Sequence, residues 1–178
     1  MRIISGKYKG KTISAPKQLP VRPTTDFAKE GLFNIIENNF DIDDLSVLDL
    51  FCGTGNISLE FASRGAKNIT SVDANNHCVR FVKETSTQLE LKQIQVIKQD
   101  VFRFLQKSIH QFDFIFADPP YQLKELTEIP DLIFKNNWLK DNGWLVVEHD
   151  KFVEFSKHPN FFQHRKYGNV NFSFFQNL

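Results

Sequence analysis

Asp118-Pro119-Pro120-Tyr121 is the segment whose residue types point most directly to a chemical role. Proline has no backbone N–H, so the two prolines and the Asp118 carboxylate present only hydrogen-bond acceptors in a stiff loop. Such acceptors suit an amino group, for example the exocyclic amine of a nucleobase, and would hold it toward an electrophile. Tyr121 adds a ring on which a base can stack. The segment predicts a loop that binds an aromatic amine, with an ordinary turn after a strand as the alternative.

A second candidate is the loop from Asp49 to Asn56, in which Gly53 and Gly55 have G-x-G spacing. Glycines at such a turn allow the backbone to approach a ligand closely. The third glycine of the dinucleotide fingerprint would stand where the chain has Ser58, which argues against a bound pyrophosphate. Asp73 follows at roughly the 20-residue interval typical of an acid that binds ribose hydroxyls. These residues predict an adenosine-containing cofactor without a pyrophosphate, a description that S-adenosylmethionine (SAM) meets.

The spacing of apolar residues predicts alternating strands and helices around these loops. Four acids, Asp49, Asp73, Asp100 and Asp118, come at or just after the ends of successive predicted strands. Because the ligands of open α/β sheets bind at the carboxyl ends of the strands, these acids are expected to share one site. We expect strands at residues 46–50, 68–73, 94–97, 112–117 and 144–148, and helices at 57–63, 75–91, 101–109 and from about 124.

This alternation predicts an α/β protein with a mostly parallel sheet and right-handed crossovers. Strand-like runs at residues 161–165 and 171–175, with a turn between them, predict a C-terminal antiparallel hairpin added to the sheet. A small N-terminal β-hairpin is expected within residues 1–15, and a helix at about 26–38. We divide the chain into an N-terminal hairpin-and-helix extension, residues 1–40, and a main domain, residues 41–178.

The net charge of the 178-residue chain is +1, from 22 basic and 21 acidic side chains, which by itself indicates no particular partner. The first thirty residues, however, hold seven Lys and Arg against two acids. Such a basic arm is typical of a surface that contacts nucleic-acid phosphates, and a run of solvated lysines is the alternative.

The two cysteines, Cys52 and Cys78, have no spacing typical of a metal site or a disulfide framework, so we expect no metal and a reducing compartment. No apolar run approaches the length of a membrane helix, and the first residues do not resemble a signal peptide. We expect a soluble, cytoplasmic monomer without a membrane partner.

With these motifs in place, the chain resembles the RsmD-type bacterial methyltransferases. These are class I SAM-dependent enzymes with a Rossmann-like fold, and they methylate N2 of a guanine in small-subunit ribosomal RNA. The glycine loop and D-P-P-Y are common to many methyltransferases, whereas the opening segment and R-P-T-T-D are more specific to this family. The resemblance rests on residues 1–6, 22–26, 48–55, 63–66, 114–121, 147–149 and 165–168.

The resemblance implies a role for particular residues at each part of the site. The methionine end of SAM would be bound by Asp49, Gly53 and Gly55, the ribose by Asp73, and the adenine by Asp100 and Val101. The guanine would be held by the catalytic segment Asp118, Pro119, Pro120 and Tyr121, with Pro120 offering its carbonyl. RNA would be contacted by Arg2, Lys7, Lys9, Lys11, Arg22, Thr24 and Thr25, within a ribosomal assembly particle.

Several alternatives stay open at this stage. D-P-P-Y suits the N6 amine of adenine in DNA or RNA equally well, and a non-catalytic RNA-binding or ribosome-assembly protein could keep the same fold. A nicotinamide-dependent dehydrogenase is disfavoured by Ser58. The pair Glu148-His149 either assists binding or is a hydrogen-bonded structural pair, and Gly31 stands where the family has alanine and should weaken its helix by up to ~1 kcal/mol.

Overall fold

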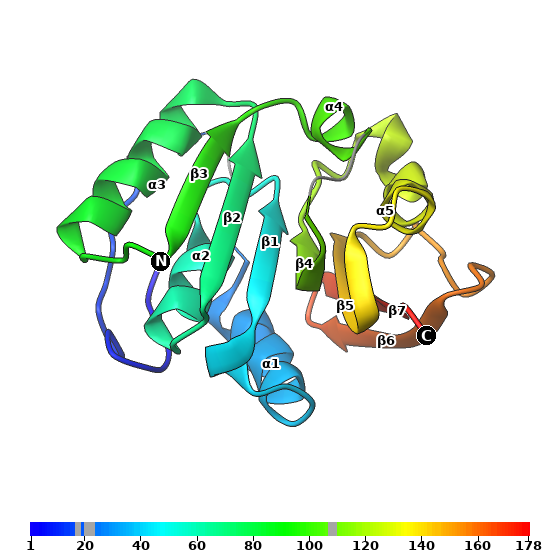
Figure 1. Ribbon diagram of the computed structural model, residues 1–178, viewed down its shortest axis with the longest axis horizontal. Helices are drawn as coiled ribbons and strands as arrows, with labels where there is room; N and C mark the ends of the chain where they lie inside the picture. The colour runs from blue at the N-terminus through cyan, green and yellow to red at the C-terminus, as the bar shows by residue number, and fades with distance from the viewer. Residues whose placement is uncertain (17–18, 20–23, 107–109) are drawn as a thin grey trace.

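The computed structural model describes residues 1–16, 19, 24–106 and 110–178. Its seven-stranded sheet has the order β3-β2-β1-β4-β5-β7-β6 (Figure 1). The strands are β1 (Ser46–Leu50), β2 (Asn68–Asp73), β3 (Ile94–Lys98), β4 (Phe112–Ala117), β5 (Leu139–His149), β6 (Phe161–Tyr167) and β7 (Val170–Gln176). The helices are α1 (Asp26–Glu37), α2 (Asn56–Ser63), α3 (Asn76–Gln88), α4 (Val101–Leu105) and α5 (Ile129–Lys135), with short 3₁₀ turns η1 (Ile42–Asp44) and η2 (Lys124–Glu128).

The sheet is mixed, as the sequence predicts. Strands β1 to β5 are parallel, whereas β7 is antiparallel to β5 and β6 is antiparallel to β7. Two reversals make β6 run in the same direction as β5. The turn between β6 and β7 therefore lies at the same edge of the sheet as the carboxyl ends of β1 to β5.

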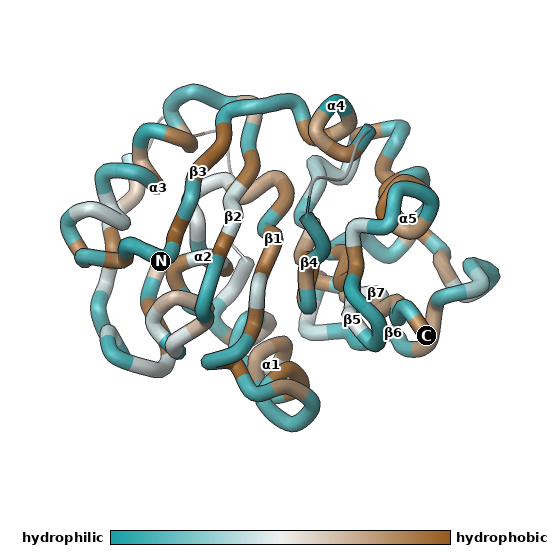
Figure 2. Tube along the Cα trace, in the orientation of Figure 1, coloured by the Kyte–Doolittle hydropathy of each residue, from teal (hydrophilic) through white to brown (hydrophobic). Residues whose placement is uncertain are grey.

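Two hydrophobic clusters cover the two faces of the sheet. Phe114 and Phe116 of β4 pack with α1 and α2 on one face, and Ile115 packs with α4 and α5 on the other. Successive side chains of a strand point to opposite faces, so a nearly continuous apolar strand such as β4 can be buried on both sides. Figure 2 shows hydrophobic residues in β1 and β3 and hydrophilic residues along many of the outer loops.

The expected N-terminal β-hairpin is reduced to one isolated antiparallel bridge between Arg2 and Thr12. Beside this bridge, Ile3 N donates to the Lys11 carbonyl at 3.0 Å and Ile13 N to the Met1 carbonyl at 2.9 Å. The backbone between the two arms also bonds to α2. The N–H groups of Ile4 and Ser5 donate to the Glu60 carboxylate at 2.9 and 3.0 Å, and Lys7 N donates to the carbonyl of the last α2 residue. The two arms are therefore joined by a short antiparallel contact that forms no regular strands, and the segment between them packs on α2.

Other boundaries differ slightly from expectation. The helix expected from Lys124 begins as a 3₁₀ turn and becomes α-helical at α5, where Pro130 occupies the first turn. Strand β5 begins five residues earlier than expected, because it pairs with β4 through an irregularity at its start. Across the described ranges, no helix is both long and apolar enough to cross a membrane.

Candidate active site

A cavity of about 960 Å³ lies at the carboxyl edge of the sheet and collects the four acids expected there. Its lining includes Asp49, Asp73, Asp100 and Asp118, each from a different strand end. The strand order sets the positions of the four acids. The ends of β3, β2 and β1 lie at one side of the cavity, and those of β4 and β5 lie at the other. The lining also includes Thr24, Thr25, Phe27, Gly53, Val101, Pro119, Pro120, Tyr121, Glu148 and 167–170.

Three residues of the glycine loop after β1 have left-handed backbone conformations. Phe51, Gly53 and Gly55 have φ angles of 58°, 52° and 73°. Gly53 lines the cavity, and its N–H donates to Asp73 Oδ2 at 2.9 Å. Gly55 lies behind the cavity, where an added Cβ would come within 2.9 Å of Val82 Cγ2. The two glycines therefore have separate purposes: one exposes backbone to a ligand, and the other lets α2 approach α3.

Asp49 is buried at the base of this loop, with 1% of its surface exposed. Ser58 donates both its N–H, at 3.1 Å, and its hydroxyl to Asp49 Oδ2. Burial raises the pKa of the Asp49 carboxyl to about 7, although the Ser58 hydrogen bonds oppose that rise. Ser58 stands at the position of the third fingerprint glycine, where its N–H and hydroxyl orient the Asp49 carboxylate at the wall of the cavity.

Asp73 and Asp100 hold their own loops while facing the cavity. Asp73 Oδ1 accepts from Asn75 N at 2.7 Å, and Asp100 caps α4 by accepting from Arg103 N at 2.9 Å. A carboxylate has about four acceptor sites, so both retain capacity for a ligand. Val101, buried to 2% exposure, lies beside them. An apolar wall between two acids suits an adenine ring and its ribose, and these donors and acceptors fit SAM.

The D-P-P-Y loop follows β4 on the opposite side of the cavity from Asp73 and Asp100. Burial raises the pKa of the Asp118 carboxyl well above its ordinary value, and the nearby carboxylates of Glu148 and Asp49 raise it further. The Pro120 carbonyl, expected to face the amine, accepts from Leu123 N at 2.9 Å. The loop therefore places a carboxyl with a raised pKa at the cavity, while the Pro120 carbonyl closes a turn.

Glu148 is the residue that the sequence analysis did not assign to the site. It is 4% exposed at the end of β5, where its Oε1 accepts from the Tyr121 hydroxyl and its Oε2 from the Thr24 hydroxyl, both at 2.9 Å. Its position at a carboxyl strand end was the available signal. His149, by contrast, is a structural partner, with Nε2 at 2.8 Å from Ser173 Oγ.

The chain is similar in sequence to known proteins. A family model described as "Conserved hypothetical protein 95" matches residues 1–176. "Putative rRNA methyltransferase YlbH" of Bacillus subtilis is 39% identical, covering 86% of this chain and 85% of its own length. "Ribosomal RNA small subunit methyltransferase D" of Buchnera aphidicola is 35% identical, covering 84% of this chain and 76% of its own.

The chain belongs to this RsmD-type methyltransferase family. The solved structure "Putative methyltransferase yhhF from Escherichia coli" superposes on it with a TM-score of 0.88 at 26% identity, covering 99% of this chain and 97% of that chain. The RsmD-type chain therefore has the class I SAM-dependent methyltransferase fold, with antiparallel strands at its C-terminal end.

The expected RNA-contacting residues of this RsmD-type chain fall into separate places. Thr24 and Thr25 line the cavity, and Arg2 pairs with Asp26 at 3.1 Å at the start of α1. The basic loop of Lys7, Lys9 and Lys11 instead lies beside the far ends of α2 and α3, and none of the three lines the cavity. Arg22 lies outside the described residues.

A buried polar chain joins the N-terminal segment to the D-P-P-Y loop. Lys29 Nζ, fully buried, lies 3.0 Å from Glu60 Oε2 and donates to Asn56 Oδ1 at 2.8 Å. Asn56 Nδ2 donates to the Thr24 carbonyl at 3.1 Å, and the Thr24 hydroxyl donates to Glu148. Lys29 is therefore a structural cation and not part of an RNA-binding arm.

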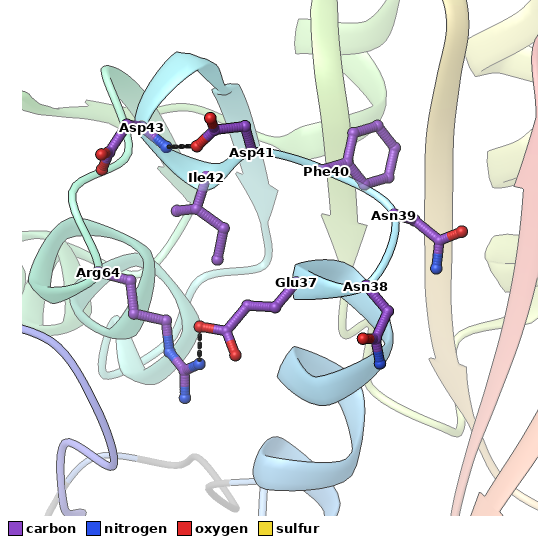
Figure 3. Close-up of a pocket in the computed structure, with 8 residues that line it drawn as sticks. All are labelled: Glu37, Asn38, Asn39, Phe40, Asp41, Ile42, Asp43 and Arg64. Carbon is purple, nitrogen blue, oxygen red and sulfur yellow. Dashed lines mark hydrogen bonds and ion pairs between the residues drawn. The ribbon is translucent and has the colours of Figure 1, made fainter.

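A second pocket of about 560 Å³ lies at the end of α1 and around η1, next to the amino end of β1 (Figure 3). Arg64 Nη1 pairs there with Glu37 at 2.6 Å, and Asp41 accepts from the Asp43 backbone. Because these groups bond to one another at the edge opposite the glycine loop, the pocket forms no part of the candidate active site.

Asp49 predicts a pH dependence of cofactor affinity. The ionised carboxylate of Asp49 would bind the amino group of SAM, whereas burial raises the pKa of free Asp49 to about 7. Affinity for SAM is therefore expected to fall by up to about tenfold per pH unit below that pKa and to level off above it. Calorimetric titration over about pH 5.5–7.5 measures this, and Asp49→Asn should flatten the profile. A flat profile in the unmodified protein would contradict the assignment.

Proposed function

We propose that this RsmD-type chain transfers the methyl group of SAM to the exocyclic N2 amine of a guanine in small-subunit ribosomal RNA. The observation that carries the proposal is the single cavity shared by the glycine loop and the D-P-P-Y loop. Their separation across the sheet gives one side to a nucleoside cofactor and the other to an amine. The ribosomal RNA assignment is supported by the printed names of the relatives.

At the cofactor side, Asp49 and Gly53 would bind the methionine part, with Gly55 shaping the loop, and Asp73, Asp100 and Val101 would bind the adenosine. SAM supplies an electrophilic methyl group on a positively charged sulfur. The buried carboxyls of Asp49 and Glu148 complement that charge, because a cation lowers the cost of ionising carboxyls in a cavity. The same acids thus favour a cationic cofactor over a neutral one.

At the substrate side, the Asp118 carboxylate accepts one N–H of the amine. We assign the second acceptor to the Pro119 carbonyl, because the Pro120 carbonyl accepts from Leu123. When the amine nitrogen gains a methyl group it loses one proton, and the raised pKa of Asp118 suits its carboxylate oxygen to hold that proton. Tyr121, oriented by its hydrogen bond to Glu148, stacks on the guanine.

The guanine must leave its stack to enter this cavity, so an unpaired or flipped nucleotide is required. Thr24 and Thr25 at the cavity, together with Arg2 at the start of α1, would receive the RNA strand. Lys7, Lys9 and Lys11 would add phosphate contacts farther along the particle, on a surface separate from the cavity. Residues 1–40 would in this way form an RNA-binding extension of the methyltransferase domain.

The test is methylation of small ribosomal subunits from a strain that lacks the gene. The purified protein is incubated with radiolabelled SAM and these subunits, and the labelled nucleoside is identified. N2-methylguanosine is the expected product. N6-methyladenosine would favour the adenine alternative, which D-P-P-Y suits equally well, and a protein without SAM binding would favour a non-catalytic role.

A further inference from the structure

Phe27, in the first turn of α1, is an apolar side chain left open to solvent at the mouth of the cavity. It is 66% exposed and lines the cavity. Most side chains of α1 that face the sheet, such as Leu32 and Phe33, are fully buried. A large exposed ring beside a binding cavity is therefore a candidate contact surface.

The Phe27 ring is supported by Tyr167, which ends β6. The two rings meet edge to face, with centroids 5.6 Å apart and an interplanar angle of 81°. Tyr167 itself lies against the backbone of α1, since a Cβ at Gly31 would overlap its ring, and its ring centroid is 6.0 Å from that of Phe172. Gly31 costs helix stability, and its position under Tyr167 explains why alanine is absent there.

The position of this aromatic pair relative to the reaction follows from the strand order. The turn between β6 and β7, residues 167–170, lines the same cavity as Asp118 and Glu148. In the sheet it lies beyond β4 and β5, on the side away from the acids that follow β2 and β3. The Phe27–Tyr167 pair therefore adjoins the amine side of the cavity and not the cofactor side.

Exposed cations accompany the pair. Arg165 is exposed and lies two residues before Tyr167 on β6, so the two side chains share one face of the sheet, and the Arg2 guanidinium binds Asp26, the neighbour of Phe27. Aromatic rings beside cations bind single-stranded nucleic acids, because the rings stack on bases while the cations contact the backbone. The charge and the rings together indicate RNA as the occupant of this surface.

We propose that Phe27 and Tyr167 form a stacking platform for the nucleotide next to the methylated guanine in the RNA strand. This inference rests on the proposed RNA methylation and adds a second base-binding position to the cavity. Tyr121 stacks on the target base, and the platform holds its neighbour, so that the strand is splayed at the target. The platform would then contribute affinity for RNA without affecting SAM.

The test uses a single-stranded RNA of about ten nucleotides that contains one guanosine flanked by the fluorescent base 2-aminopurine. Stacking of 2-aminopurine on a ring quenches its fluorescence. In the presence of SAM, binding to the unmodified protein should quench the signal. Phe27→Ala should remove the quenching and weaken RNA binding about 5- to 150-fold, whereas Phe27→Tyr, which keeps a ring, should retain both.

Phe152→Ala is the matched control, because Phe152 is also an exposed phenylalanine, at 82%, but does not line the cavity. It should change neither quenching nor affinity. Gly31→Ala displaces Tyr167 without touching Phe27 and should also reduce quenching. SAM affinity should stay unchanged in all variants.

Unchanged quenching in Phe27→Ala would overturn the platform. So would a loss of binding to ribosomal particles with no loss for the RNA strand, since Phe27 would then contact a protein. The proposed function is tested separately by the identity of the methylated nucleoside, so either can fail alone. A product of N6-methyladenosine would change the target base while the 2-aminopurine signal still reports the platform.

Discussion

Asp118→Ala is expected to lower the rate of methyl transfer by about 10²–10⁴-fold. The variant removes both an acceptor for the amine and the carboxylate placed to hold its proton. Affinity for SAM should change little, because the groups assigned to the cofactor lie on β1, β2 and β3. Single-turnover methylation measures the first effect, and equilibrium binding of SAM measures the second.

Two further variants define the role of Asp118. Asp118→Asn keeps a carbonyl acceptor but cannot hold the proton, so its activity should lie between those of the parent and the alanine variant. Asp141→Ala alters an exposed acid near the amino end of β5 and should leave the rate unchanged. If Asp118→Ala abolished SAM binding as well as transfer, the assignment of Asp118 to the amine side would be wrong.

Glu60→Ala should lower the free energy of unfolding by about 3–5 kcal/mol. The Glu60 carboxylate is fully buried and bonds to two backbone N–H groups of the N-terminal segment, at Ile4 and Ser5, and to the side chains of Lys29 and Arg64. Its removal leaves the Lys29 ammonium in the core without its ion-pair partner. Burial already lowers the pKa of Lys29, while Glu60 raises it, so the variant should also favour the neutral amine.

Urea denaturation measures this loss, with Glu84→Ala as the control. Glu84 pairs with Arg80 at the same i, i+4 spacing as Glu60 and Arg64, but its side chain is 59% exposed. An exposed pair contributes about 0–1 kcal/mol, so the control should be almost as stable as the parent. Equal losses of unfolding free energy in Glu60→Ala and Glu84→Ala would show that burial does not determine how much the Lys29–Glu60 pair contributes to stability.

Local patterns were sufficient to predict most of the architecture. The strand at residues 112–117 and the helix that starts at Asp26 were correct, because apolar spacing and N-capping are properties of neighbouring residues. Of the predicted N-terminal hairpin only a short antiparallel contact around Arg2 and Thr12 is present, because the N–H groups of Ile4 and Ser5 bond to Glu60, which is distant in sequence. No local pattern reports a partner of that kind.

The same division applies to the candidate site. The glycine loop, the four strand-end acids and D-P-P-Y are short motifs, and the alternation of strands and helices was enough to place them at one edge of the sheet. Tertiary structure decided what connects them. Glu148 accepts from Tyr121, 27 residues away, and from Thr24, 124 residues away, and Gly31 leaves room for the Tyr167 ring from a distant part of the chain. Motifs depend on the order of residues along the chain, whereas these partners are selected by packing, which exists only once the chain has folded.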